Sequence, residues 1–144
     1  MERSAGIIVY KGDRLFLVRA AGPFDKGTER WTVPKGLVDE QDEDDWSAAV
    51  REWEEETGDR IRNDEYYDLG EITAGNKRNH LFAVEQEAEW KCSNTFRFHF
   101  RNGRTGIYNE TDAGGWFTLQ EAERMLPKSL RGFIPRLRAV MKGE

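Results

Sequence analysis

The stretch from Gly36 to Gly58, GLVDEQDEDDWSAAVREWEEETG, is the part of the chain around which the rest is organised. It follows a predicted turn, Pro-Lys-Gly at positions 34–36, because proline restricts the residue before it and glycine permits a tight bend. We predict a helix that begins near Asp44 or Asp45, since aspartate caps helix N-termini and favours the positive end of the helix dipole. The helix should end near Thr57, with Gly58 in the left-handed conformation that follows many helices.

One side of this predicted helix is apolar. At about 100° per residue, its larger apolar side chains fall in a single stripe. The stripe contains Trp46, Ala49, Val50, Trp53 and Thr57. We expect this face to pack on a sheet.

The other side of the helix is crowded with carboxylates. Glu52, Glu55 and Glu56 stand at i, i+3 and i+4, so they share a face roughly opposite the apolar stripe. Like charges at this spacing each cost roughly a few tenths of a kcal/mol, and Arg51 neutralises only part of the charge. One interpretation is a solvated acidic surface. The other is a site for a divalent cation, with Ala48 leaving space one turn earlier.

Composition limits what the whole chain can be. Its 144 residues, 38% of them hydrophobic, predict one domain over 1–144. A single cysteine, Cys92, excludes an internal disulfide and favours a reduced, cytoplasmic setting. The apolar run from Ala5 to Tyr10 is too short for a signal sequence or a membrane span, so no membrane association is expected. The net charge of −5 disfavours general nucleic-acid binding, and a bound polyanion would need a divalent metal to shield it from the carboxylates.

The remaining sequence alternates between strand and turn patterns, which predicts an α+β fold with an α/β/α arrangement. The expected strands are 5–10 and 14–19 as a hairpin, then 31–33, 66–73, 79–85, 94–100 and 115–117. Loops or turns are expected at 20–30, 74–78 and 101–111. Thr118 and Glu121 form a predicted capping box for a helix to Met125, and a last helix follows Pro127, with Pro135 in its first turn or at a break.

The second half of the opening stretch resembles the signature of the Nudix hydrolases. That signature is Gly, five residues, Glu, seven residues, then Arg-Glu-hydrophobic-x-Glu-Glu-x-Gly-hydrophobic, and Arg51 to Gly58 matches it residue for residue. Counting back from Arg51 places the first Glu at Glu43, so the loop from Gly36 is one residue longer than in the family. Asp59 at the last hydrophobic position and Gln41-Asp42 in the loop also depart from the pattern.

Weaker similarity extends over most of the chain. It points to the bacterial Nudix branch known as diadenosine polyphosphate hydrolase-like. The segments that carry it are 4–6, 22–24, 31–36, 75–77, 82–85, 93–96, 116–117 and 133–137.

The resemblance implies a Nudix sandwich with a mixed central sheet, and Mg²⁺ or Mn²⁺ as cofactor. It implies Glu52, Glu55, Glu56 and the carbonyl of Gly36 as metal ligands, with Arg51 orienting Glu52 or Glu55. The general base would be Glu52 or, alternatively, Glu110. Glu43 and Gly58 would support the loop and the helix end, Glu43 through an ion pair.

Contacts to a substrate are expected from basic and aromatic side chains. Lys35, Lys77 and Arg78 are candidate phosphate contacts, each with a solvent-facing charge as the alternative. Phe24, Trp31, Tyr108 and Phe133 are candidates for stacking on a base, with packing in the core as the alternative. His80 and His99 are expected to be structural, and Cys92 inert.

The activity implied is hydrolysis of a nucleoside diphosphate linked to another group, such as a dinucleoside polyphosphate. The alternatives within the enzyme class are a nucleoside triphosphate pyrophosphohydrolase, an RNA 5′-end pyrophosphohydrolase and a diphosphoinositol phosphatase. A different class is a Nudix-fold module that binds a nucleotide without turning it over. The protein is expected to be a monomer or a homodimer.

Overall fold

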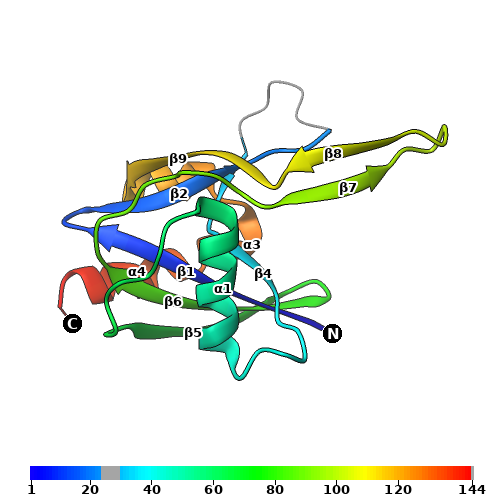
Figure 1. Ribbon diagram of the computed structural model, residues 1–144. Helices are drawn as coiled ribbons and strands as arrows, with labels where there is room; N and C mark the ends of the chain where they lie inside the picture. Colours follow the sequence, from blue (N-terminus) through cyan, green and yellow to red (C-terminus); the bar gives the residue numbers. More distant parts are fainter. Residues whose placement is uncertain (24–29, 144) are drawn as a thin grey trace.

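A long strand, β1 (Glu2–Lys11), runs through the middle of a mixed sheet in the computed structural model, which describes residues 1–23 and 30–143 (Figure 1). It pairs in parallel with the whole of β6 (Lys77–Glu85), and β5 (Tyr67–Ala74) forms the edge beyond β6. On its other side β1 meets β2 (Arg14–Ala20) near one end and β4 (Lys35–Leu37) near the other. The sheet continues from β2 to β3 (Trp31–Thr32) and β9 (Thr111–Thr118), both antiparallel to it.

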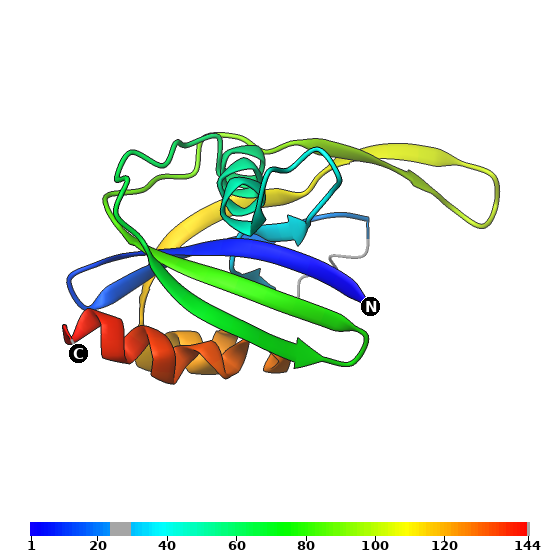
Figure 2. The ribbon, with the colours of Figure 1, turned by 90° about the horizontal axis from the view of Figure 1, so that it is seen from below.

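Helices cover both faces of this sheet. Helix α1 (Asp45–Thr57) lies on one face, and α2 (Leu119–Met125), α3 (Lys128–Arg131) and α4 (Phe133–Met141) lie on the other (Figure 2). The predicted α/β/α sandwich with a mixed sheet is therefore confirmed. No helix in the described part of the chain is long and apolar enough to cross a membrane.

Helix α1 is fixed on the sheet by Trp53, which is completely buried. Its ring lies 5.8 Å from that of Phe16, and Ala48 and Ala49 are buried beside it. Burying a large apolar side chain of this kind contributes about 1.5–3 kcal/mol to stability. Ala48 thus belongs to the core.

The ends of α1 are set by the residues predicted to set them. The Asp44 side chain accepts a hydrogen bond of 2.8 Å from the backbone N–H of Ser47. Gly58 has φ of +73° and donates its N–H to the carbonyl of Glu54 at 2.9 Å. The C-terminal prediction is also confirmed, because the Thr118 and Glu121 capping box is present and Pro135 lies in the first turn of α4.

The predicted turn at positions 34–36 is wrong. Lys35 and Gly36 lie in β4, which pairs with β1 so that Lys35 is opposite Gly6 and Gly36 is opposite Ala5. The reason is that β2 pairs only with the C-terminal end of β1. The N-terminal part of the same edge of β1 is therefore open, and β4 pairs with it.

The predicted loop at 101–111 is also wrong. It contains β8 (Thr105–Asn109), which forms an antiparallel hairpin with β7 (Thr95–His99). The chain reverses at the Asn-Gly pair 102–103, where Gly103 has φ of +88°, and an Asn-Gly pair between strand-forming segments favours such a hairpin. Strand β9 is correspondingly longer than the predicted 115–117, because it pairs along most of β2.

Replacing Gly58 should destabilise the fold more than replacing another left-handed glycine. A methyl group on Gly58 would come within 2.6 Å of Cys92 Sγ and 2.9 Å of its backbone nitrogen, whereas nothing lies within 4 Å of one on Gly12. Left-handed strain alone costs about 1–2 kcal/mol, and overpacking adds about 1–3 kcal/mol. We expect urea unfolding to show a loss of about 3 kcal/mol for Gly58→Ala and about 1 kcal/mol for the control Gly12→Ala. Equal losses would contradict this account of the helix end.

Candidate active site

Three carboxylates meet at the C-terminal half of α1. Oxygen atoms of Glu52, Glu56 and Glu110 all lie within 4.8 Å of one another. Glu52 and Glu56 are only 7% and 6% exposed, although the sequence placed them on the side of the helix away from the core. The helix therefore buries its acidic face against β4 and the segment around Glu110, and the solvated acidic surface is excluded for these two side chains.

Strand β4 shapes one wall of this cluster. The backbone N–H of Lys35 donates a hydrogen bond of 3.1 Å to Glu56 Oε2. Next to it, Gly36 lies so close to Glu52 that a methyl group in its place would overlap the carboxylate. The Pro-Lys-Gly sequence thus supplies a donor to one carboxylate and room for another.

Glu110 is held opposite the helix by backbone hydrogen bonds. Its N–H donates to the carbonyl of Asn94 at 2.9 Å, and the N–H of Asn94 donates to the carbonyl of Glu55 at 2.7 Å. The hydroxyl of Thr111 donates to the carbonyl of Glu56. The bend between β8 and β9 is thereby fastened to the end of α1, which brings Glu110 to the cluster.

The cluster carries more negative charge than its surroundings neutralise. Burial, followed by repulsion from Glu52 and Glu110, raises the pKa of Glu56 to about 9. Burial also raises the pKa of Glu52 and of Glu110. Hard divalent cations bind carboxylate oxygens, so a buried set of three carboxylates fits an ion of the magnesium type.

Arg51 is the cation that the chain itself supplies. It donates to Glu52 at 3.0 Å and to Glu55 at 3.4 Å, and it binds Asp42 through two hydrogen bonds of 2.8 and 3.0 Å. These bonds lower the pKa of Asp42, and Asp42 leads the groups that raise the pKa of Arg51. Arg51 also reaches the carbonyl of Leu37 at 3.2 Å, so it joins the helix to the loop before it.

The ion pair expected of Glu43 is made by Asp42, which the sequence analysis missed. Glu43 is exposed, and it has no ion pair within residues 1–23 and 30–143. Asp42 stands six residues after Gly36, the family's spacing for the first acidic residue, so counting forward from Gly36 would have found it. The extra residue therefore lies between Asp42 and Arg51.

Glu55 lies at the margin of the site. Its side chain is 31% exposed and contacts Arg51, and it is not one of the three carboxylates that converge. Glu55 does contribute to the raised pKa of Glu110, so the two are near each other.

The three basic candidates differ in where they lie. Lys35 is half-buried, and burial followed by repulsion from Lys77 lowers its pKa, while Glu56 and Glu52 oppose the shift. Lys77 and Arg78 are in β6 and not in the predicted turn, which is reduced to Gly75-Asn76. Successive residues of a strand face opposite sides, so only one of the two can share a face with Lys35. Lys35 and Leu81 both stand opposite Gly6 of β1, so Lys77, four residues before Leu81, shares the face of Lys35. Arg78 pairs with Glu71 at 3.8 Å.

The aromatic candidates divide similarly. Phe133 is completely buried, so it is core and not available for stacking. Trp31 packs edge-on against Phe117 with ring centres 4.9 Å apart, and Tyr108 is in the β7–β8 hairpin. Phe24 lies outside the described residues.

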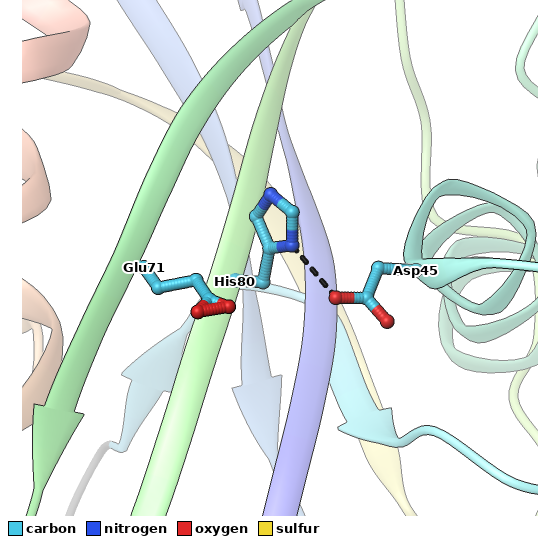
Figure 3. A group of neighbouring side chains, drawn as sticks. All are labelled: Asp45, Glu71 and His80. Carbon is cyan, nitrogen blue, oxygen red and sulfur yellow. Dashed lines mark hydrogen bonds and ion pairs between the residues drawn. The ribbon is translucent and has the colours of Figure 1, made fainter.

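A second group of possible metal ligands, Asp45, Glu71 and His80, lies at the other end of α1 (Figure 3). Both imidazole nitrogens are already engaged, Nδ1 with Asp45 at 2.8 Å and Nε2 with Asp68 at 2.7 Å. His80 therefore ties the first turn of α1 to β5 and β6, as expected of a structural histidine. His99 is exposed on β7.

Comparison with known proteins agrees with this fold. A family model described as NUDIX domain matches residues 1–137. An uncharacterized 17.7 kDa protein in the e-segB intergenic region of Enterobacteria phage T4 is 33% identical over 145 residues, which cover 96% of this chain and 91% of that protein. The chain therefore belongs to the Nudix family and is a Nudix hydrolase, an enzyme that acts on pyrophosphate bonds.

Solved structures share the fold at low sequence identity. A MutT protein from Methanosarcina mazei Go1 has a TM-score of 0.70 at 19% identity, covering 98% of this chain and 95% of its own. A C. elegans Ap4A hydrolase binary complex has a TM-score of 0.64 at 19% identity, with both chains covered fully. The NUDIX domain of Shewanella oneidensis NrtR complexed with ADP ribose has a TM-score of 0.68 at 13% identity, covering 96% and 87%.

His80 should stabilise the protein in a pH-dependent way. Burial opposes the charged imidazole, but the bonds to Asp45 and Asp68 outweigh it and raise the pKa of His80. A raised folded-state pKa gives stability that is complete below the unfolded value of about 6.5 and is lost as the pH rises through the folded value. We expect His80→Gln to lower the free energy of unfolding by about 1–2 kcal/mol at pH 5.5. The loss is limited to this range because one partner, Asp68, is exposed to solvent, and it should be smaller at pH 9.

The exposed histidine provides the control for this measurement. His99→Gln should follow the wild-type stability at both pH values. A loss for His80→Gln that grows between pH 5.5 and pH 9 would show the sign to be wrong.

Proposed function

We propose that this protein hydrolyses a phosphoanhydride bond in a nucleoside diphosphate linked to another group, using Mg²⁺ or Mn²⁺. The observation that carries the proposal is the burial of Glu52 and Glu56 beside Glu110, with the pKa of Glu56 raised to about 9. Such a cluster is unfavourable by itself and favourable around a cation. Glu52, Glu56, the carbonyl of Gly36 and, at the margin, Glu55 are the proposed ligands.

A bound divalent ion would neutralise phosphate oxygens and lower the pKa of the attacking water. The protein's own groups do the rest. Arg51 holds Glu52 and Glu55 in place, and Asp42 holds Arg51. Lys35 and Lys77 are the proposed phosphate contacts, because Lys35 is the strand neighbour of Gly36 and an anion would relieve the repulsion between the two lysines. Arg78 is a weaker candidate, since Glu71 already pairs with it.

Glu52 and Glu110 remain the two proposals for the general base. Glu110 gains support from its place at the cluster and from burial, which raises its pKa and so favours holding a proton. Glu52 has the support of the family resemblance. Comparison of pH–rate profiles for Glu52→Gln and Glu110→Gln would separate the two, because loss of the base removes the acidic limb.

We favour a dinucleoside polyphosphate as the substrate, in keeping with the diadenosine polyphosphate hydrolase-like segments. The proteins of similar fold include one named as an Ap4A hydrolase and one complexed with ADP ribose, and both ligands contain a nucleoside diphosphate linked to another group. A nucleoside triphosphate and an RNA 5′ end are the alternatives. A panel of these compounds with Mg²⁺ and Mn²⁺, read out by product mass, would identify the bond that is cleaved.

A nucleotide-binding module without turnover is the second candidate. It is favoured by the altered loop, in which Asp42 stands at the position of the family's first glutamate. Binding of a nucleotide with Mg²⁺ and no product after long incubation would support it over hydrolysis. In either case we propose action in the cytoplasm, as a monomer or a homodimer, by one domain.

Removing one buried carboxylate should abolish most of the activity. We expect Glu56→Gln to lower kcat for Mg²⁺-dependent hydrolysis at least about 100-fold, as loss of a group that stabilises transition-state charge does. Glu54→Gln is the matched control, since Glu54 is an exposed carboxylate on the same helix, and it should keep wild-type activity. If both variants hydrolyse the substrate normally, the assignment of the metal site is wrong.

Gly36→Ala should impair the site without unfolding the protein. The added methyl group would displace only the end of the Glu52 side chain, which is flexible. Misplacement of a catalytic group by about 1 Å can cost about 100-fold in rate, so we expect a loss of about 10–100-fold with little change in Tm. In the Glu52→Ala variant, adding Gly36→Ala should lower the rate almost no further, because the two residues act through one contact. Additive losses would contradict this.

A further inference from the structure

The β7–β8 hairpin extends away from the rest of the molecule (Figures 1 and 2). Its two strands of five residues pair with each other and, within the described chain, with no other strand. Five residues of strand span about 17 Å. The hairpin is therefore an arm attached to the body at its root.

The charge of the arm is opposite to that of the body. Residues 90–109 contain Lys91, Arg97, Arg101 and Arg104 and no aspartate or glutamate. Because the whole chain has a formal charge of −5, the remainder carries −9. A segment without a single carboxylate is unusual in a chain with 27 acidic residues, and its charge favours an anionic partner.

The three arginines of the arm are exposed to solvent. No ion pair joins Arg97, Arg101 or Arg104 to any residue in the described part of the chain. Arginines of the body, such as Arg51 and Arg62, are held by carboxylates at 2.8 and 2.9 Å. The arm's guanidinium groups are thus free to bind phosphate.

Aromatic rings accompany these charges. Phe96, Phe98, Phe100 and Tyr108 alternate along the two strands and share one face, and the Tyr108 ring lies 6.1 Å from Phe96 and 6.2 Å from Phe100. Arg97 and His99 lie on the opposite face, where Ile107 is 65% exposed. Arg101 and Arg104 lie in the turn next to Phe100, at the end of the aromatic face. Arginines beside aromatic rings are typical of surfaces that bind single-stranded nucleic acids, in which arginines contact the backbone and rings stack on bases.

The root of the arm lies at the candidate active site. Glu110 directly follows β8 and belongs to the carboxylate cluster, and Asn94, which precedes β7, is bonded to the carbonyl of Glu55 at 2.7 Å. A chain that follows the arm inward therefore arrives at the three carboxylates. The acidic body would repel any part of a polyanion that does not lie on the arm.

We propose that the arm binds the sugar-phosphate chain of a single-stranded polynucleotide whose 5′ end lies at the carboxylate cluster. The position of the 5′ end rests on the RNA 5′-end alternative of the proposed function, whereas the binding does not. A second copy of this chain, bound through its acidic body, is the competing occupant; the aromatic rings favour the polynucleotide.

Binding can be measured without hydrolysis, by fluorescence anisotropy of 3′-labelled oligouridylate and oligothymidylate in EDTA at several salt concentrations. For single strands, the slope of log K against log salt falls by about 0.7 for each phosphate that the protein no longer neutralises. We expect Arg101→Gln/Arg104→Gln to reduce the slope by about 1.4. The triple variant that adds Arg97→Gln should reduce it little further, because Arg97 lies on the face away from the rings. Preference for one oligonucleotide identifies RNA or DNA as the ligand.

The control removes the same charge from the body. Arg14→Gln/Arg60→Gln/Arg124→Gln replaces three exposed arginines outside the arm and should bind as the wild type does. The proposal is overturned if the wild type binds neither oligonucleotide, if the control loses as much affinity as the arm variant, or if the arm variants bind normally. It is also overturned if the arm substitutions convert a dimer into a monomer and leave oligonucleotide binding unchanged.

A kinetic measurement tests the direction of the bound chain. For the wild type, kcat/KM for a 5′-triphosphorylated eight-nucleotide strand should exceed that for the nucleoside triphosphate at least about tenfold, and the triple arm variant should lose this advantage. If the arm variants lose binding and the wild type hydrolyses neither compound, the placement of the 5′ end is refuted and the arm is supported. Hydrolysis of nucleotides with normal binding by the arm variants would refute the arm alone.

Discussion

The burial of two carboxylates between α1 and β4 is the constraint on which the rest of the structure depends. Taking a charged carboxylate out of water is costly, and two together are worse, which is why the pKa of Glu56 rises to about 9. The Lys35 N–H and the Arg51 guanidinium offset part of this cost. The rest of the cost of burying the two carboxylates must be offset by the stability of the surrounding structure.

That strength comes from parts of the fold remote from the chemistry. Trp53, on the opposite side of α1, is completely buried against Phe16, so the helix cannot rotate to expose its glutamates without losing this packing. His80 fixes the first turn of the helix to the sheet, and Gly58 fixes its last turn against Cys92. The helix is therefore held at both ends and along one side.

The sequence predicted what depends on near neighbours. The caps of α1, its apolar stripe and the spacing of its glutamates follow from residues within a few positions of one another, and the structure agrees with them. What was missed depends on distant partners. Strand β4 exists because β1 has an open edge, and Asp42 matters because Arg51 reaches it. Glu110 was expected as the alternative base, but its place in the cluster depends on backbone hydrogen bonds of Glu110 and Asn94 and on the Thr111 hydroxyl. The loop predicted at 101–111 was wrong for a local reason, since its Asn-Gly pair already favoured a hairpin.

The attachment of the β7–β8 hairpin by its root alone has a consequence for protein engineering. The turn at 101–104 is exposed, and no strand of the sheet pairs with it in the described chain, so its length and sequence can be changed without repacking the core. The carboxylates, by contrast, tolerate little change because they are buried. The hairpin can therefore vary while the carboxylate cluster is kept. Exchanging hairpins between relatives offers a way to alter which ligands reach the site without changing its catalytic residues.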